Sequence, residues 1–155
     1  QASKEDPSLY GMGTTVVAAM VLGKTVYVVN VGDSRLYVCK ESLTQVTVDH
    51  SLVEEMVQSG KLQKEEMRTH PNKNIITRAL GTNPEVKADC FEIEVEEGDV
   101  LLLCSDGLSN MMEDKTMEAI IKKNPEDMEQ AARQLVDEAN KAGGKDNISV
   151  VLVRI

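Results

Sequence analysis

One apolar run, Leu101–Cys104, restricts the possible folds more than any other stretch of this sequence. Ser105, Asp106 and Gly107 follow it at once. A continuous apolar run of this length, bounded by polar residues, predicts a short strand that is buried on both faces. The end of such a strand holds its residues in a fixed direction, as a metal ligand or a reacting group requires. Asp106 is therefore the first candidate functional residue.

Two further aspartates share this setting. An isolated Asp-Gly pair is typical of a simple turn, but Asp33 also follows an apolar run and Asp146 precedes one. If Asp33, Asp106 and Asp146 converge, their oxygen ligands predict an acidic cleft for a hard divalent cation, Mn²⁺ or Mg²⁺. Such an ion lowers the pKa of a bound water and neutralises phosphoryl charge, which favours hydrolysis of a phosphate monoester.

Six short motifs occur in a fixed order between residues 11 and 153. Together they resemble the successive motifs of the PP2C-like family of metal-dependent serine/threonine protein phosphatases, in its bacterial form. The motifs are Gly13-Thr14-Thr15, Val31-Gly32-Asp33-Ser34-Arg35, Leu43-Thr44 with Asp49-His50-Ser51, Ile76-Thr77-Arg78-Ala79-Leu80-Gly81, Leu103-Cys104-Ser105-Asp106-Gly107-Leu108 and Gly143-Gly144-Lys145-Asp146-Asn147-Ile148-Ser149. Six ordered motifs are a far more specific signal than any one of them.

The resemblance implies an α+β fold in which two antiparallel β-sheets pack as a sandwich flanked by helices. It implies hydrolysis of phosphoserine and phosphothreonine in proteins by metal-activated water, with a phosphorylated protein as substrate and a serine/threonine kinase as counterpart. Asp106 and Asp146 would hold the paired catalytic Mn²⁺ or Mg²⁺ ions, and Asp33 with Asp106 would form an additional metal site. Gly107 and Asn147 would support these ligands from their turns, Gly107 by permitting a tight bend.

The resemblance also predicts an N-terminally incomplete domain. Residues 1–10 are expected to be a ragged polar end or loop, and residues 11–155 the C-terminal major part of a PP2C-like phosphatase domain. The family's opening segment, with a phosphate-binding arginine, an acidic pair and an acid histidine, has no counterpart before Gly11. We therefore assign no catalytic side chain and expect a fragment of a full catalytic domain. The alternative is a catalytically inactive PP2C-like regulatory or binding module.

Composition excludes several other classes. Asp and Glu outnumber Lys and Arg by 26 to 17, a net charge of -9, which argues against nucleic acid and against an anionic membrane surface as partners. No apolar run is long enough to span a membrane. Cys39, Cys90 and Cys104 are too far apart for a zinc motif and odd in number, so we expect reduced core residues in a cytoplasmic protein.

Local patterns predict the order of elements. Residues 14–22 and 25–31 form a hairpin in the middle of the protein, because both strands are apolar on both faces. Residues 35–40 and 43–48 form a second hairpin, and a helix begins at the capping-box residue Ser51. Residues 61–74 form an exposed connection, which the resemblance places as a flap near the catalytic site.

The second half of the chain is predicted in the same way. Residues 91–96 alternate apolar and acidic, so one face is in water, and residues 100–104 return as the paired strand. A short helix around residues 117–121 is followed by a longer one capped by Asn124-Pro125 and ended by Gly143. The strand 148–153 is expected to be buried.

Competing interpretations of single motifs were weighed. Residues 18–25 satisfy a loose nucleotide-binding spacing, but such a loop must open a helix, and residues 25–29 predict a strand. Asp33 on its own would brace the Gly32 turn, with Arg35 as its partner. Thr14 and Thr15 fit sheet packing better than a nucleophile, since no base is nearby. Neither His50 nor His70 is assigned a catalytic role, although the resemblance implies loop bracing by His50.

Overall fold

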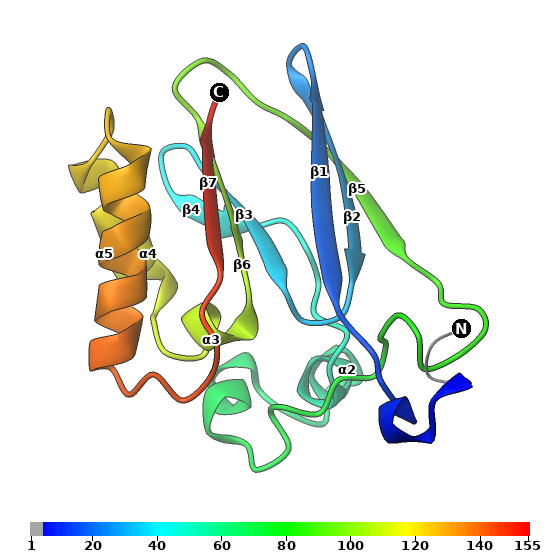
Figure 1. The fold of residues 1–155 in the computed structure, drawn as a ribbon. Coiled ribbons are helices and arrows are strands. Elements are labelled where there is room, and N and C mark those ends of the chain that lie inside the picture. Colours follow the sequence, from blue (N-terminus) through cyan, green and yellow to red (C-terminus); the bar gives the residue numbers. More distant parts are fainter. Residues whose placement is uncertain (1–4) are drawn as a thin grey trace.

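Two antiparallel sheets pack face to face in the computed structural model, which describes residues 5–155 (Figure 1). The first sheet has the strand order β1 (Val16–Leu22), β2 (Thr25–Val31), β5 (Asp89–Glu94). The second has the order β4 (Leu43–Gln45), β3 (Arg35–Cys39), β6 (Val100–Cys104), β7 (Val150–Arg154). The predicted sandwich is confirmed.

Both predicted hairpins are present. Strands β1 and β2 pair from Val16 with Val31 to Leu22 with Thr25, and Gly23 takes the positive φ of 61° that the two-residue turn needs. Strands β3 and β4 form the second, shorter hairpin. Because residues 25–31 are strand rather than helix, the nucleotide-binding interpretation of residues 18–25 fails.

The predicted pairing of the strand at 91–96 with the strand at 100–104 was wrong. β5 pairs with β2, whereas β6 pairs with β3 and β7. The connection around Gly98 carries the chain from one sheet to the other, so the two strands belong to different sheets. The alternation in β5 is confirmed: its apolar residues Phe91 and Ile93 pack against the inter-sheet core, and its glutamates are exposed.

Two apolar layers hold the fold together. The layer between the sheets is built on Val26, Val28, Leu36, Val38, Val95 and Leu101. The layer on the outer face of the second sheet is covered by α4 (Asp114–Lys123) and α5 (Met128–Lys141), which bury Met117 and Leu135 there. Figure 1 shows both helices on this side of the sandwich and, among residues 5–155, none on the outer face of the first sheet.

The longer helix starts later than predicted. Its N-cap is Asp127, whose side chain accepts a hydrogen bond from the Gln130 amide, so the assignment of Asn124 as cap was wrong. Asn124 is buried instead and donates to the Ile120 carbonyl and to Gln134. These bonds join the end of α4 to α5.

The remaining elements gather at one end of the sandwich (Figure 1). They are α2 (Leu52–Gln58), the 3-10 helix η2 (Lys64–Thr69), the short helix α3 (Asp106–Ser109) and the 3-10 helix η1 (Pro7–Leu9). Ser51 caps α2 as predicted, accepting from the Glu54 amide at 3.3 Å. Of the expected polar end at residues 1–10, residues 1–4 lie outside the described residues. No helix within residues 5–155 is long and apolar enough to cross a membrane.

The strands β1 and β7 are more exposed than predicted. The prediction that both hairpin strands lie in the middle of the protein holds for β2 and was wrong for β1, which is an edge strand. The strand predicted to be buried at 148–153 is also an edge strand, and Val151 in it is 55% exposed. Each has a neighbour on only one side within the described residues. Cys90, expected in the core, is exposed on β5, whereas Cys39 and Cys104 are buried.

Candidate metal centre

The strand register brings the three predicted aspartates to one end of the second sheet. Arg35, the first residue of β3, pairs with Cys104, the last residue of β6, and Cys104 pairs with Val150, the first residue of β7. Asp33 lies two residues before β3, Asp106 two residues after β6, and Asp146 four residues before β7. Antiparallel pairing therefore places residues that are far apart in sequence beside each other.

The pKa shifts of the aspartates link the other two carboxylates to Asp106. Burial, and next the negative charge of Asp106, raise the pKa of Asp33 to about 6. Burial, and next the charge of Asp146, raise the pKa of Asp106. The charge of Asp106 thus acts on Asp33, and the charge of Asp146 acts on Asp106. No Lys, Arg or His among residues 5–155 forms an ion pair with any of the three.

Asp33 and Asp106 line one small pocket with about 30 Å³ of free volume. That volume matches one water molecule or one small ion. Ser109 and Asn110 of the α3 segment also line it, and the Ser109 hydroxyl is buried without a hydrogen-bond partner. Asp146 adjoins Asp106 but does not line this pocket. The structure therefore brings Asp33 and Asp106 together in one pocket, with Asp146 near Asp106 but outside the lining of that pocket.

The donor chemistry of this group fits a hard divalent cation. All three candidate ligands are carboxylates, and burial together with a neighbouring carboxylate raises the pKa of Asp33 and of Asp106, which is the condition that a bound cation relieves. Within residues 5–155, however, no three His, Cys, Asp or Glu side chains are grouped closely enough to hold an ion by themselves. The described residues therefore do not form a complete ion site by themselves.

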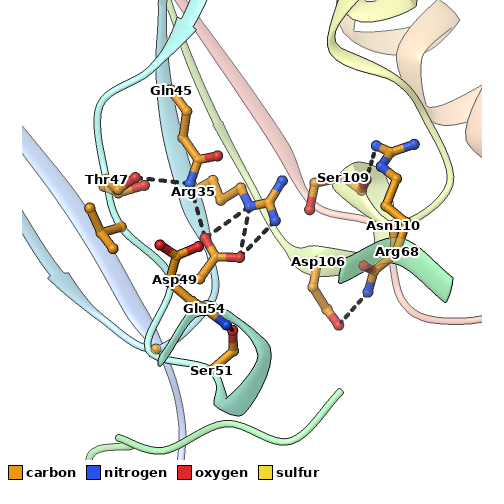
Figure 2. Close-up of polar contacts among 12 residues, drawn as sticks. Arg35, Gln45, Thr47, Asp49, Ser51, Glu54, Arg68, Asp106, Ser109 and Asn110 are labelled. Atoms are coloured by element: carbon orange, nitrogen blue, oxygen red, sulfur yellow. Dashed lines mark hydrogen bonds and ion pairs between the residues drawn. The ribbon is translucent and has the colours of Figure 1, made fainter. Parts of the chain in front are cut away.

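The interpretation of Asp33 as the partner of Arg35 was wrong. Arg35 instead donates hydrogen bonds to Asp49 (Figure 2). Its Nε lies 2.9 Å and 3.0 Å from the two carboxylate oxygens, and its Nη2 lies 2.7 Å from Oδ2. Arg35 also donates to the Tyr37 hydroxyl, and Gln45 donates to Asp49. Since Asp49 takes the guanidinium, the carboxylate of Asp33 stays available.

His50 braces the Gly32 turn, as the resemblance implied. Its Nδ1 accepts from the Gly32 amide at 3.0 Å, and its own amide donates to the Gly32 carbonyl at 2.9 Å. Nε2 lies 3.1 Å from Asp89, which also receives Arg78 at 2.9 Å. A Cβ on Gly32, at φ +111°, would approach the Thr15 side chain to 2.3 Å. Sequence reasoning missed Asp89, because it belongs to a different strand and no local pattern links it to His50.

Gly107 acts through its small size. It lies in the first turn of α3 without a positive φ, and a Cβ there would be 2.3 Å from the Asn147 carbonyl oxygen. The predicted tight bend at Asp106-Gly107 is therefore a close packing contact between α3 and the Asp146 loop. The Ser105 hydroxyl joins the same two segments, donating to the Asn147 carbonyl at 3.0 Å and accepting from the Ser149 amide at 3.0 Å.

The segment 61–74 lies over the pocket, and Met67, Arg68 and Lys73 contribute to its lining. Arg68 of η2 donates to the Ser109 carbonyl at 2.8 Å and also to the Met112 carbonyl (Figure 2). These bonds fasten the segment to the C-terminal end of α3. Asn110 donates to Asp106 Oδ2 at 3.2 Å and so orients one candidate ligand. Neither Arg68 nor Asn110 carried a sequence signal of its own.

Comparison with known proteins agrees with this geometry. Residues 2–56 match the family described as protein phosphatase 2C, and residues 58–155 match stage II sporulation protein E. The serine/threonine phosphatase stp of Listeria monocytogenes is 45% identical over 152 residues, which are 97% of this chain and 60% of that protein. The chain thus spans about three fifths of the length of the curated relatives it matches.

Solved structures give the same result. The Mycobacterium tuberculosis serine/threonine phosphatase PstP/Ppp has a TM-score of 0.93 at 35% identity, covering 99% of this chain and 65% of that one. The catalytic domain of the serine threonine protein phosphatase PstP in complex with two manganese ions has a TM-score of 0.86 at 36% identity, covering 97% and 62%. With its six ordered motifs, its two-sheet fold and these matches, the chain belongs to the PP2C-like family of metal-dependent serine/threonine protein phosphatases.

Proposed function

We propose that this protein hydrolyses phosphoserine and phosphothreonine in proteins, with Mn²⁺ or Mg²⁺ as cofactor. The observation that carries the proposal is the pair of carboxylates, Asp33 and Asp106, that share one pocket and form no ion pair with any described Lys, Arg or His, while Asp146 adjoins Asp106. The relatives named above are phosphatases, and one solved relative carries two manganese ions, which supports the choice of cofactor.

Three aspartates would hold the ions: Asp106 and Asp146 the catalytic pair, and Asp33 with Asp106 an additional ion. Bound there, a divalent cation would supply a water of lowered pKa and would neutralise phosphoryl charge. The chain's own residues fix the ligands. Asn110 orients the Asp106 carboxylate, and the Ser105 hydroxyl together with the contact of Gly107 with Asn147 holds the Asp146 loop against α3.

Phosphorylated proteins are the proposed substrates, and a serine/threonine kinase that modifies them is the proposed counterpart. We place the reaction in the cytoplasm, a choice supported by the three free cysteines. Residues 11–155 would form the larger part of the phosphatase domain. The relatives named above give no support to the alternative of an inactive regulatory module.

Isothermal titration calorimetry of Mn²⁺ into this chain tests the metal site directly. Asp106→Asn should abolish the binding heat, because Asp106 shares the pocket with Asp33 and also adjoins Asp146. Asp137→Asn, at an exposed position on α5, should leave it unchanged. Equal binding by both variants would exclude Asp106 as a ligand.

A chimera tests the reaction itself. The part of L. monocytogenes stp that this chain does not match is joined to the chain in its native order, and release of phosphate from a phosphothreonine peptide is followed with Mn²⁺. Asp106→Asn should lower the rate by about 100-fold or more, and Asp137→Asn should not. A chimera that binds Mn²⁺ yet releases no phosphate would favour the inactive module.

A further inference from the structure

One polar side chain beside the candidate metal centre is buried without a partner. Ser109 is only 2% exposed, and its hydroxyl makes no hydrogen bond to any residue in the range 5–155. Burying a hydroxyl without a partner is costly, and native proteins rarely do so. The hydroxyl is therefore expected to bind a small polar ligand.

The position of Ser109 in α3 turns it toward the pocket that Asp33 and Asp106 line. Asp106, Ser109 and Asn110 are residues i, i+3 and i+4 of one helical turn, so their side chains share one face. All three line the pocket (Figure 2), whereas Leu108 of the same turn is 0% exposed and packs in the core. The ligand of the Ser109 hydroxyl is thus expected inside this pocket.

The Ser109 hydroxyl does not make the bond that is usual for a serine in a helix. Such a hydroxyl often donates to the carbonyl three or four residues earlier. Here the Ser105 carbonyl accepts the Leu108 amide and the Asp106 carbonyl accepts the Asn110 amide, and Ser109 bonds to neither. Asn110 already orients the Asp106 carboxylate, at 3.2 Å from Oδ2. The protein thus leaves the Ser109 hydroxyl for a group in the pocket.

The pocket has the size and the polarity that a bound water requires. Its free volume of about 30 Å³ matches one water molecule, and a buried water needs two to four polar partners. The Ser109 hydroxyl and the carboxylates of Asp33 and Asp106 are such partners. The backbone of Ser109 is itself held in place, because its carbonyl accepts a hydrogen bond from Arg68 at 2.8 Å.

We propose that Ser109 is a positioning residue whose hydroxyl binds a water molecule in this pocket, and that this water is a ligand of the ion at Asp33 and Asp106. The inference rests on the proposed function, since it needs an ion at these two aspartates. Mg²⁺ held by carboxylates keeps several waters. A protein group that orients such a ligand strengthens binding without touching the ion.

Isothermal titration calorimetry with Mn²⁺ compares the wild type with two variants of Ser109. Ser109→Ala removes the hydroxyl and should lower manganese affinity by about tenfold or more. Ser109→Thr keeps the hydroxyl and should bind Mn²⁺ within about threefold of the wild type. Without the ion, Ser109→Ala should melt no lower than the wild type, because no hydrogen bond within the protein is lost.

Thr47→Val is the matched control, at a buried hydroxyl that does have a partner. Thr47 is 3% exposed, and its hydroxyl accepts from the Leu36 amide at 3.1 Å. Removing that acceptor should lower the melting temperature of the metal-free protein and leave manganese affinity unchanged. The two substitutions should thus have opposite patterns of effect, which a general loss of stability would not produce.

Three results would overturn the role of Ser109. They are wild-type manganese affinity in Ser109→Ala, a lower melting temperature of that variant without the ion, and equally weak binding by Ser109→Thr. Asp106→Asn distinguishes this failure from that of the proposed function. If Asp106→Asn loses Mn²⁺ while Ser109→Ala keeps it, the metal site stands and only the inference falls. If Asp106→Asn binds as the wild type does, or if the wild type binds no Mn²⁺, both fall.

Discussion

Arg35 and Asp49 form a two-pronged ion pair next to the candidate metal centre, with Arg35 Nη2 2.7 Å from Asp49 Oδ2. The Arg35 and Asp49 side chains are 19% and 8% exposed, so neither charge is fully solvated. The pair takes up the guanidinium of Arg35, which lies two residues after Asp33 in the sequence. That choice of partner leaves the Asp33 and Asp106 carboxylates free for a cation.

Removing Arg35 should destabilise the protein strongly. Arg35→Met leaves Asp49 buried without its cation, which should lower the free energy of unfolding by about 3 kcal/mol. Replacing both residues, with Asp49→Leu added, should recover most of that loss. Urea unfolding measures the change. Arg133→Met, which breaks the exposed pair with Glu129, is the control and should change stability by less than about 0.5 kcal/mol. Equal losses in the two single variants would contradict a special role for the Arg35–Asp49 pair.

Asp33→Asn should stabilise the metal-free protein at neutral pH. The pKa of Asp33 is raised from 3.8 to about 6 in the fold, chiefly by burial. Its favourable contribution is therefore complete below about pH 3.8 and is lost as the pH rises through 6. At pH 7.5 the variant should be more stable by about 1–2 kcal/mol, after allowance for partial exposure, and at pH 3.5 about equal.

Added Mn²⁺ should reverse this order. The wild-type protein should gain more thermal stability from the ion than the Asp33→Asn variant, because a ligand that binds only the folded state stabilises it. Asp137→Asn should follow the wild type throughout. A variant that is no more stable than the wild type at pH 7.5 would show that Asp33 has another partner in solution.

His50→Leu should loosen the turn that carries Asp33. The substitution removes the acceptor of the buried Gly32 amide and one partner of the partly exposed Asp89, and should cost about 2 kcal/mol. Manganese affinity should fall as well, since Gly32 directly precedes the proposed ligand Asp33. His70→Leu is the control: His70 accepts only the exposed Asn72 amide, and its loss should have little effect on either quantity. Unchanged manganese affinity in His50→Leu would show that the hydrogen bonds of His50 to the Gly32 turn do not affect manganese binding.

Gly107→Ala should move the Asp146 loop away from Asp106. Its Cβ would lie 2.3 Å from the Asn147 carbonyl oxygen, so the loop must shift, at a cost of about 2 kcal/mol. Gly98→Ala is the comparison: its φ is +95° but nothing lies within 4 Å of a Cβ there. That change should cost only about 1 kcal/mol in backbone strain and leave manganese binding intact. Equal manganese affinity in the two variants would contradict the packing role of Gly107.

This chain alone should be a poor catalyst. Because no three potential ligands among the described residues form a complete ion site, para-nitrophenyl phosphate should be hydrolysed at least about 100-fold more slowly than by full-length L. monocytogenes stp, even with Mn²⁺. Steady-state kinetics at matched protein concentration decide the point. A comparable rate would show that the described ligands suffice.

Local periodicity alone determined most of the elements of this protein. The apolar run ending at Cys104, the alternation from Phe91 and the stripe around Leu135 each depend on neighbours within about one strand or helix, so a sequence pattern records them. The ordered motifs added the family and the candidate ligands Asp33, Asp106 and Asp146.

Only the tertiary structure decided which segments meet. That Arg35 binds Asp49 and His50 meets Asp89, and that β5 and β6 join different sheets, depends on strand register between distant segments, which no local pattern records. The exposure of β1 and β7 was missed for the same reason. Apolar residues on both faces indicate that a strand suits burial, but whether it is buried depends on which strands lie beside it.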